Sequence, residues 1–234
     1  YRGIAVGSVF GKLFSLVLHG RLDAWAEAQG LRAQGQAGFR DGKCTNNHVF
    51  VLKHLADRCQ KSDRVYACFI DFRKAYDLVR RDLLMQCLAD LGARGNMLSC
   101  LVSMYWSTPM VVKNGRERGP AVASGGELLR VLLYADDLTL LAQTPEALQA
   151  LLNALHEFCA ANCLHVNVAK SAVMVFGKQK PRVGKHIPPQ GWMFEGARLP
   201  VVSEFRYLGI TFHQTAGVSA CTSALSAAAM RAMW

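Results

Sequence analysis

The chain of 234 residues is 51% hydrophobic and 19% charged, a balance that excludes an intrinsically disordered protein. Lys and Arg number 27 against 17 Asp and Glu, and the formal net charge of +10 favours a polyanionic partner, nucleic acid before a membrane surface. A basic globular protein without such a partner is the alternative. No apolar run reaches the roughly 18 residues of a membrane span, so no membrane partner is expected. Eight cysteines without a Cys-x-x-Cys pair predict reduced thiols and an intracellular chain.

The first half of the chain is predicted to contain three helices and one buried strand. A helix with one apolar face follows Thr45. The run Val65–Ile70 is apolar throughout and bounded by charge, which predicts a strand buried on both faces. A second helix begins near Asp82 and ends at Gly92, and a third spans residues 98–106.

The second half is predicted to complete an antiparallel sheet. Asn114-Gly115 indicates a hairpin turn, and Arg130–Gln143 reads as two apolar strands joined by a turn. Thr144 and the proline after it mark the start of a long helix. The other predicted elements are short strands at Val173–Phe176 and Phe205–Phe212 and a basic linker at Gly177–Gly191. The expected class is α+β, an antiparallel sheet with helices on one side.

Three carboxylates are predicted to meet at one edge of this sheet. Asp71 directly follows the buried strand, and Asp136 and Asp137 occupy the turn in RVLLYADDLTLLAQ. Adjacent like charges are costly unless a cation or hydrogen bonds compensate. If the strands are neighbours, the three side chains can hold two divalent cations, the arrangement used for in-line displacement at phosphorus. Hard oxygen ligands favour Mg²⁺ over zinc. A solvated turn is the alternative for the aspartate pair.

A second cluster of metal-ligand residue types lies further along the chain, at His156, Cys159, Cys163 and His165. Zinc would require all four side chains to converge. The two cysteines are four residues apart on a segment that is otherwise apolar, which favours core packing over a zinc site.

The motifs resemble those of reverse transcriptases. FIDFRKAYD resembles motif A and LLYADDLTLLAQ resembles motif C, while LHVNVAKSAVMVFG and FRYLGITF are similar to motifs D and E. The segments YRGIAVGSVFGKLFSLVLHGRL and QAGFRDGKCTNNHVFVLKHL resemble the N-terminal fingers blocks. The order of the blocks agrees with the lineage of non-LTR (LINE-like) retrotransposons and of the related group II intron enzymes. The resemblance covers residues 1–212.

This resemblance implies a polymerase right hand. Residues 1–66 would be the fingers, residues 67–212 the palm, and residues 213–234 the start of a thumb that is mostly absent. Motif B, with its Gly-x-x-Gln-Gly pattern and long palm helix, is missing near residues 116–130. The loss of that helix is expected to leave part of the sheet uncovered and apolar surface exposed. The chain is expected to be a fragment of a longer protein.

The family pattern also implies catalytic roles. Asp71, Asp136 and Asp137, with the main-chain carbonyl of Phe72, would hold two Mg²⁺ ions, with Mn²⁺ as an alternative. Lys170 occupies the motif D lysine position and would protonate the leaving pyrophosphate, the alternative being a solvated loop lysine.

Substrate-binding roles follow in the same way. Tyr76 occupies the position that packs under the sugar and excludes a 2′-hydroxyl, the alternative being a core aromatic. Arg40 and Lys43 would hold the incoming triphosphate or the template, with Arg2 as a weaker candidate. The residues Tyr207, Leu208 and Gly209 would form the primer grip, and a tight β turn is equally compatible with them.

The predicted activity is therefore RNA-directed DNA synthesis, a nucleotidyl transfer to a primer 3′ end. Its partners would be an RNA template, a DNA primer and dNTPs, and a retroelement enzyme is expected to act in the nucleus. One alternative is a catalytically inactive, nucleic-acid-binding remnant of a retroelement. Another is an RNA-dependent RNA polymerase, which the GFR and YADD motifs fit poorly.

Overall fold

The fold described here is that of a computed structural model, which describes residues 8–59, 64–76, 78–106 and 131–215. Asn114-Gly115, Arg2, most of residues 213–234 and the 116–130 region where motif B is predicted to be missing lie outside these residues. Within the described parts, no helix is both long and apolar enough to cross a membrane.

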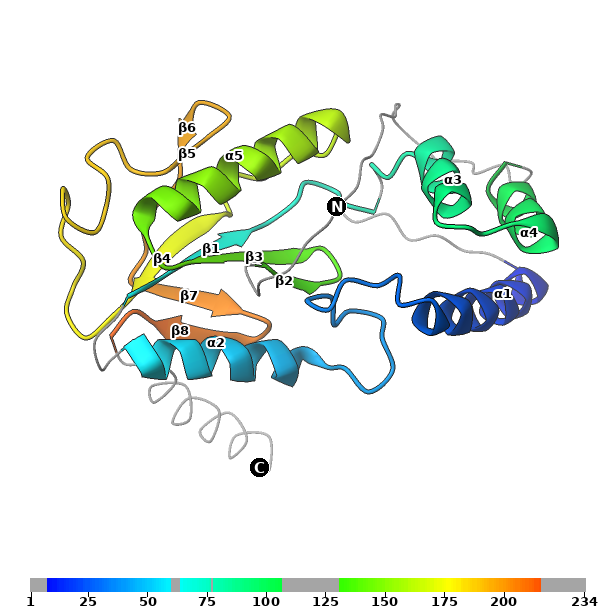
Figure 1. Ribbon diagram of the computed structural model, residues 1–234, viewed down its shortest axis with the longest axis horizontal. Helices are drawn as coiled ribbons and strands as arrows, with labels where there is room; N and C mark the ends of the chain where they lie inside the picture. Colours follow the sequence, from blue (N-terminus) through cyan, green and yellow to red (C-terminus); the bar gives the residue numbers. More distant parts are fainter. Residues whose placement is uncertain (1–7, 60–63, 77, 107–130, 216–234) are drawn as a thin grey trace.

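The predicted α+β class is confirmed (Figure 1). Four strands form one antiparallel sheet in the order β2-β3-β1-β4, and four other strands form two separate hairpins. The elements are α1 (Val9–Ala28), α2 (Thr45–Cys59), β1 (Val65–Ile70), α3 (Arg81–Asp90), α4 (Gly95–Trp106), β2 (Val131–Tyr134), β3 (Asp137–Ala142), α5 (Pro145–Ala161), β4 (Ala172–Phe176), β5 (Met193–Phe194), β6 (Ala197–Arg198), β7 (Glu204–Tyr207) and β8 (Ile210–His213).

Helices cover both faces of the sheet, so the expectation of helices on one side is wrong (Figure 1). The reason lies in β1, whose successive side chains point to opposite faces and are apolar on both. Tyr66 and Cys68 pack on the α5 side, whereas Ala67 and Phe69 pack on the side of α2 and the β7–β8 hairpin.

Helix α5 begins where the sequence predicts. The Thr144 side chain accepts a hydrogen bond from the Ala147 N–H at 3.1 Å, and Pro145 occupies the first turn. The residues that face the sheet recur at helical spacing and are buried, namely Leu148, Leu152, Leu155 and Cys159. Burial of this stripe fixes α5 across the sheet.

The expectation of an uncovered sheet is wrong for β1, β3 and β4, whereas in the edge strand β2 only Leu132 is buried. All of β4, and all of β1 except its first residue, are buried, and β3 is exposed only at Asp137. The exposed large apolar side chains instead gather on α1, which contacts α4 through Leu18 and was not predicted. The most exposed of them on that helix are Val9, Phe10, Leu13, Phe14, Leu16 and Val17.

The segment Phe205–Phe212 forms a hairpin and not the single strand predicted. Tyr207 pairs with Ile210, which leaves Leu208 and Gly209 as a two-residue turn. Both have positive φ, +48° and +86°, the combination that suits the twist of a tight hairpin. The interpretation of these residues as a tight β turn is therefore confirmed as local structure.

Candidate active site

Asp136 and Asp137 lie at a tight turn at one end of the sheet. Tyr134 pairs with Asp137, so the connection between β2 and β3 is the two-residue turn Ala135-Asp136, which we call the aspartate turn. Ala135 has φ +57°, an unusual value for a residue with a Cβ. The two strands predicted from the sequence are therefore present and are broken at this point. The turn lies at the end of the sheet that faces α1, α3 and α4 (Figure 1).

Asp71 lies beside this turn, as predicted from the strand pattern. Ile70, the last residue of β1, pairs with Leu138, so the next residue along each strand is Asp71 on one and Asp137 on the other. Asp137 has a raised pKa, mainly through partial burial and further through the charges of Asp136 and Asp71. The structure thus brings the three predicted carboxylates to one sheet edge, where their charges interact.

The backbone of Asp71 is held by a segment that precedes β4. The buried Ser171 Oγ accepts from the Asp71 N–H at 3.1 Å, and the Asp71 carbonyl accepts from the Asn167 N–H at 2.7 Å. The same Ser171 hydroxyl donates to the Asn167 carbonyl at 3.0 Å. Ser171 was missed from the sequence, where its only signal is its place directly after Lys170.

Phe72 continues this arrangement by pairing with Val166 in an antiparallel bridge. The flanking bonds run from the Arg73 N–H to the His165 carbonyl and from the Asn167 N–H to the Asp71 carbonyl. In this pattern the amide and carbonyl of Phe72 point away from Val166. They point toward the side of β1 on which β3 and the aspartate turn lie.

Tyr76 reaches the aspartate turn from the segment after β1. Its hydroxyl donates to Asp136 Oδ1 at 3.4 Å, a long hydrogen bond. The pKa of Tyr76 is raised by partial burial and by the charges of Asp136 and Asp137. The residue is 63% exposed, so the alternative of a core aromatic is excluded. Its ring is available at the surface beside the carboxylates.

The donor chemistry of this edge fits a hard divalent cation, because it consists of carboxylate oxygens, and the charges of Asp136 and Asp71 act on Asp137. Their side chains are not gathered around one point: among the described residues, no three His, Cys, Asp or Glu side chains could share a metal ion. The second cluster of metal-ligand residue types, at His156, Cys159, Cys163 and His165, lies on α5 and directly after it. There Cys159 is buried in the core, while the His156 side chain is half exposed, 3.9 Å from Glu195.

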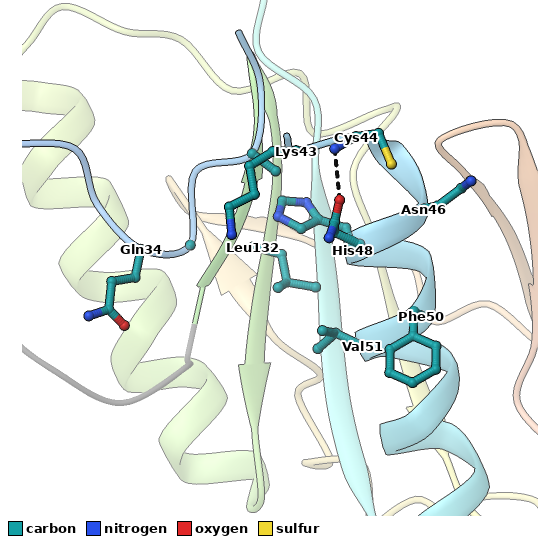
Figure 2. Close-up of a pocket in the computed structure, with 11 residues that line it drawn as sticks. Gln34, Lys43, Cys44, Asn46, His48, Phe50, Val51 and Leu132 are labelled. Carbon is teal, nitrogen blue, oxygen red and sulfur yellow. Dashed lines mark hydrogen bonds between the residues drawn. The ribbon is translucent and has the colours of Figure 1, made fainter. Parts of the chain in front are cut away.

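The predicted basic residues lie on the loop between α1 and α2. Arg40 donates to Glu27 Oε2 at 2.7 Å and to the Ala33 carbonyl at 3.1 Å, which ties it to α1. Lys43 is exposed and lines a cavity of about 390 Å³ between this loop, the start of α2 and β2 (Figure 2). The cavity mixes polar and apolar side chains, from Gln34 and Lys43 to Leu132 and Phe50.

The remaining predicted residues are placed as follows. Lys170 is exposed on the segment that holds Asp71, and its amide donates to the Asn167 carbonyl. Tyr207 is buried, with its hydroxyl 3.4 Å from His48 Nδ1, and burial raises its pKa to about 12. His48 is buried too and has a lowered pKa for that reason. In the predicted primer grip, Gly209 is therefore exposed, whereas Leu208 is partly buried and packs against the core.

Residues 120–212, from just before β2 into β8, match the family described as reverse transcriptase (RNA-dependent DNA polymerase). The chain carries a reverse transcriptase domain. The matched residues of this domain include Asp136, Asp137, Lys170 and the Tyr207-Leu208-Gly209 turn. Asp71 and Tyr76 precede the matched residues in the sequence. Strand pairing places Asp71 beside the aspartate turn, and the Tyr76 hydroxyl contacts Asp136.

The chain is also similar to a protein of a retrotransposable element. The chain is 29% identical over 246 positions to the "Putative 115 kDa protein in type-1 retrotransposable element R1DM" of Drosophila melanogaster. The alignment covers 90% of the chain but 22% of the relative, so the chain spans about a fifth of that protein's length. Because 246 aligned positions exceed the 234 residues of the chain, the relative contains residues that this chain lacks.

Proposed function

We propose that this chain forms the fingers and palm of a retrotransposon reverse transcriptase, adding deoxynucleotides to a DNA primer on an RNA template. Residues 1–66 would be the fingers, residues 67–212 the palm and residues 213–234 the start of the thumb. The observation that carries the proposal is the placement of Asp71, Asp136 and Asp137 at one sheet edge with Tyr76 beside them. In a reverse transcriptase domain, nucleotidyl transfer would take place at this edge of the sheet.

The carboxylates and the Phe72 carbonyl would hold the divalent cations. When bound, two such ions, Mg²⁺ or Mn²⁺, would supply the charge that lowers the pKa of the primer 3′-hydroxyl and offsets the charge that develops at phosphorus. Asp71 is suited to this work because Ser171 and Asn167 fix its backbone. The Phe72 carbonyl points to the side where the aspartate turn lies. The exposed Lys170 would donate a proton to the leaving pyrophosphate.

Other residues would bind the substrates. The ring of Tyr76 would lie under the incoming sugar, and the Leu208-Gly209 turn would contact the primer. Lys43, exposed at the cavity beside β2, would contact the template or triphosphate. Arg40 would support this surface through its contact with Glu27. A retroelement enzyme of this kind would act in the nucleus.

Primer extension by the purified chain tests the proposal, with an RNA template, a DNA primer, dNTPs and Mg²⁺. We expect extension by the chain as written and none by Asp136→Asn. Extension of equal yield by both proteins would overturn the assignment of the site.

The second candidate is a catalytically inactive, nucleic-acid-binding remnant. It is favoured by the residues that the R1 relative has and this chain lacks, and by the missing motif B pattern. A remnant would bind the template with an affinity that falls as salt rises, because a chain of net charge +10 releases counterions on binding. It would not extend the primer with Mg²⁺ or with any other divalent cation.

Replacement of Tyr76 by Ala is expected to let ribonucleotides compete with deoxynucleotides. Removal of the ring opens the space in which a 2′-hydroxyl would clash, and one such contact is worth about 1–3 kcal/mol, or about 10–200-fold in discrimination. The measurement is the ratio of kcat/KM for dGTP and GTP. The matched control is Tyr76→Phe, which loses only the hydroxyl at Asp136 and should keep the wild-type ratio. An unchanged ratio in Tyr76→Ala would refute the role.

A further inference from the structure

The side-chain carboxamide of Gln36 joins the loop between α1 and α2 to the aspartate turn. Its Oε1 accepts from the Ala135 N–H at 3.1 Å and from the Gly38 N–H at 2.7 Å. Ala135 lies 99 residues away along the chain, and it is one of the two residues of the turn. One oxygen atom therefore binds the backbone of the turn to the backbone of the loop.

The loop packs directly against β2, and this close packing determines the position of Gln36. The Leu133 N–H donates to the Gly35 carbonyl and the Ala37 N–H donates to the Leu133 carbonyl, each at 2.9 Å. A Cβ at Gly35 would lie 2.5 Å from the Val131 carbonyl oxygen, and one at Gly38 would lie 2.3 Å from the Ala135 nitrogen. Only glycine fits at these two positions, and their spacing places Gln36 opposite the turn.

The conformation of the Ala135-Asp136 turn is one that a hydrogen bond to Gln36 can stabilise. Ala135 has φ +57°, a conformation that residues with a Cβ rarely adopt unless their surroundings hold them in it. The following residues, Asp136 and Asp137, carry adjacent negative charges that repel each other. The hydrogen bond to the Ala135 amide fixes the backbone from which both carboxylates project.

We propose that Gln36 is a positioning residue: its carboxamide oxygen holds the Ala135-Asp136 turn in the conformation in which Asp136 and Asp137 bind a divalent cation. Gln36 does not touch the reacting groups and acts through the turn. The inference rests on the proposed function for the identity of the site. It assigns a role to the glutamine of the QAGFR segment, for which the motif resemblance supplied none.

The test is a Mg²⁺ titration of the melting temperature, which reports cation binding without requiring catalysis. Gln36→Met keeps the length of the side chain and removes the acceptor, whereas Gln36→Glu keeps an acceptor oxygen. We expect the Mg²⁺ concentration for half-maximal stabilisation to rise about tenfold or more in Gln36→Met, the usual effect of losing a group that orients a metal ligand. Gln36→Glu should stay within about threefold of wild type, and so should Gln34→Met, an exposed neighbour without that contact.

A double-mutant cycle tests whether Gln36 acts on Mg²⁺ binding through the Ala135-Asp136 turn. Glycine adopts positive φ without strain, so Ala135→Gly should remove most of the Mg²⁺ defect of Gln36→Met when the two are combined. A purely structural role would lower the melting temperature without changing the Mg²⁺ dependence. Should Gln36→Met not fold, the shorter Gln36→Asn cannot reach the turn and carries the same prediction.

The outcomes separate this inference from the proposed function. A normal Mg²⁺ response in Gln36→Met, or none in the wild-type chain, overturns the role of Gln36. If the wild-type chain does not extend a primer but Gln36→Met still needs more Mg²⁺, the proposed function fails and the inference stands. If extension occurs, kcat should fall in Gln36→Met while KM for dNTP changes little.

Discussion

Replacing Asp137 by Asn is expected to abolish primer extension while raising the thermal stability of the cation-free chain. Loss of the carboxylate should reduce extension by at least about 100-fold, which corresponds to about 2.7 kcal/mol. Stability should rise because the native state holds Asp137 near Asp136 and Asp71, which raises its pKa. Since Asp137 is partly exposed and screened by solvent, the gain should not exceed about 1 kcal/mol, or about 2–4 °C.

The pH dependence of this effect has a definite sign. Because the pKa of Asp137 is higher in the folded than in the unfolded state, the folded chain keeps a proton that the unfolded chain has lost. The stability of the wild-type chain therefore falls, relative to Asp137→Asn, as pH rises above the ordinary aspartate value of about 4. Below that value both states are protonated and the two proteins should melt alike.

Melting curves of both proteins between pH 3 and pH 8, with and without Mg²⁺, measure this difference. Mg²⁺ should stabilise the wild-type chain more and close the gap. The control is Glu157→Gln on the exposed face of α5, which should melt like the wild-type chain at every pH. An Asp137→Asn protein that is less stable than wild type at pH 8 would contradict the electrostatic argument.

Replacing Trp192 by Ala is expected to cost about 3–5 kcal/mol of stability, or roughly 10 °C or more in melting temperature. Trp192 is fully buried, lies 5.9 Å from the ring of Tyr66 between centroids, and donates from Nε1 to the Pro145 carbonyl at 2.9 Å. It joins the linker after β4 to the start of α5. The substitution removes these contacts and leaves a cavity in the core.

Chemical denaturation followed by circular dichroism measures this loss. Trp192→Phe keeps an aromatic ring but loses the hydrogen bond to Pro145, and should show an intermediate loss. Phe50→Ala is the matched control, because Phe50 is 68% exposed and its removal should change stability by less than about 0.5 kcal/mol. Equal midpoints for Trp192→Ala and Phe50→Ala would show that the Trp192 contacts are unimportant.

The sequence predicts the elements whose signals are local. The apolar run of β1, the cap at Thr144 and the two strands around the aspartate turn all appear where expected. Helix α1 was missed because its apolar residues occur on several sides of the helix and not on one stripe. A tight turn at Leu208-Gly209 was one of two interpretations, but Phe205–Phe212 was predicted as a single strand because Leu208, a residue that disfavours positive φ, occupies one of the two turn positions.

The candidate site likewise has contacts that the sequence predicts and contacts that it does not. That Asp71 would lie beside Asp137 followed from strand order, since the end of one strand and the turn of its neighbour share an edge. The contacts of Gln36 with Ala135 and of Ser171 with Asp71 could not be predicted, because they join residues 99 and 100 positions apart. No local pattern encodes which loop a distant turn will meet. The burial of Tyr207 against His48 escaped prediction for the same reason.

The bonds that Ser171 and Asn167 make to Asp71 have a mechanical consequence. They attach both the amide and the carbonyl of Asp71 to the short segment on which Lys170 lies. A displacement of that segment is therefore transmitted to the backbone of Asp71. The proposed proton donor and the proposed cation ligand are thus anchored to the same segment, so a substitution that shifts this segment would change the position of both.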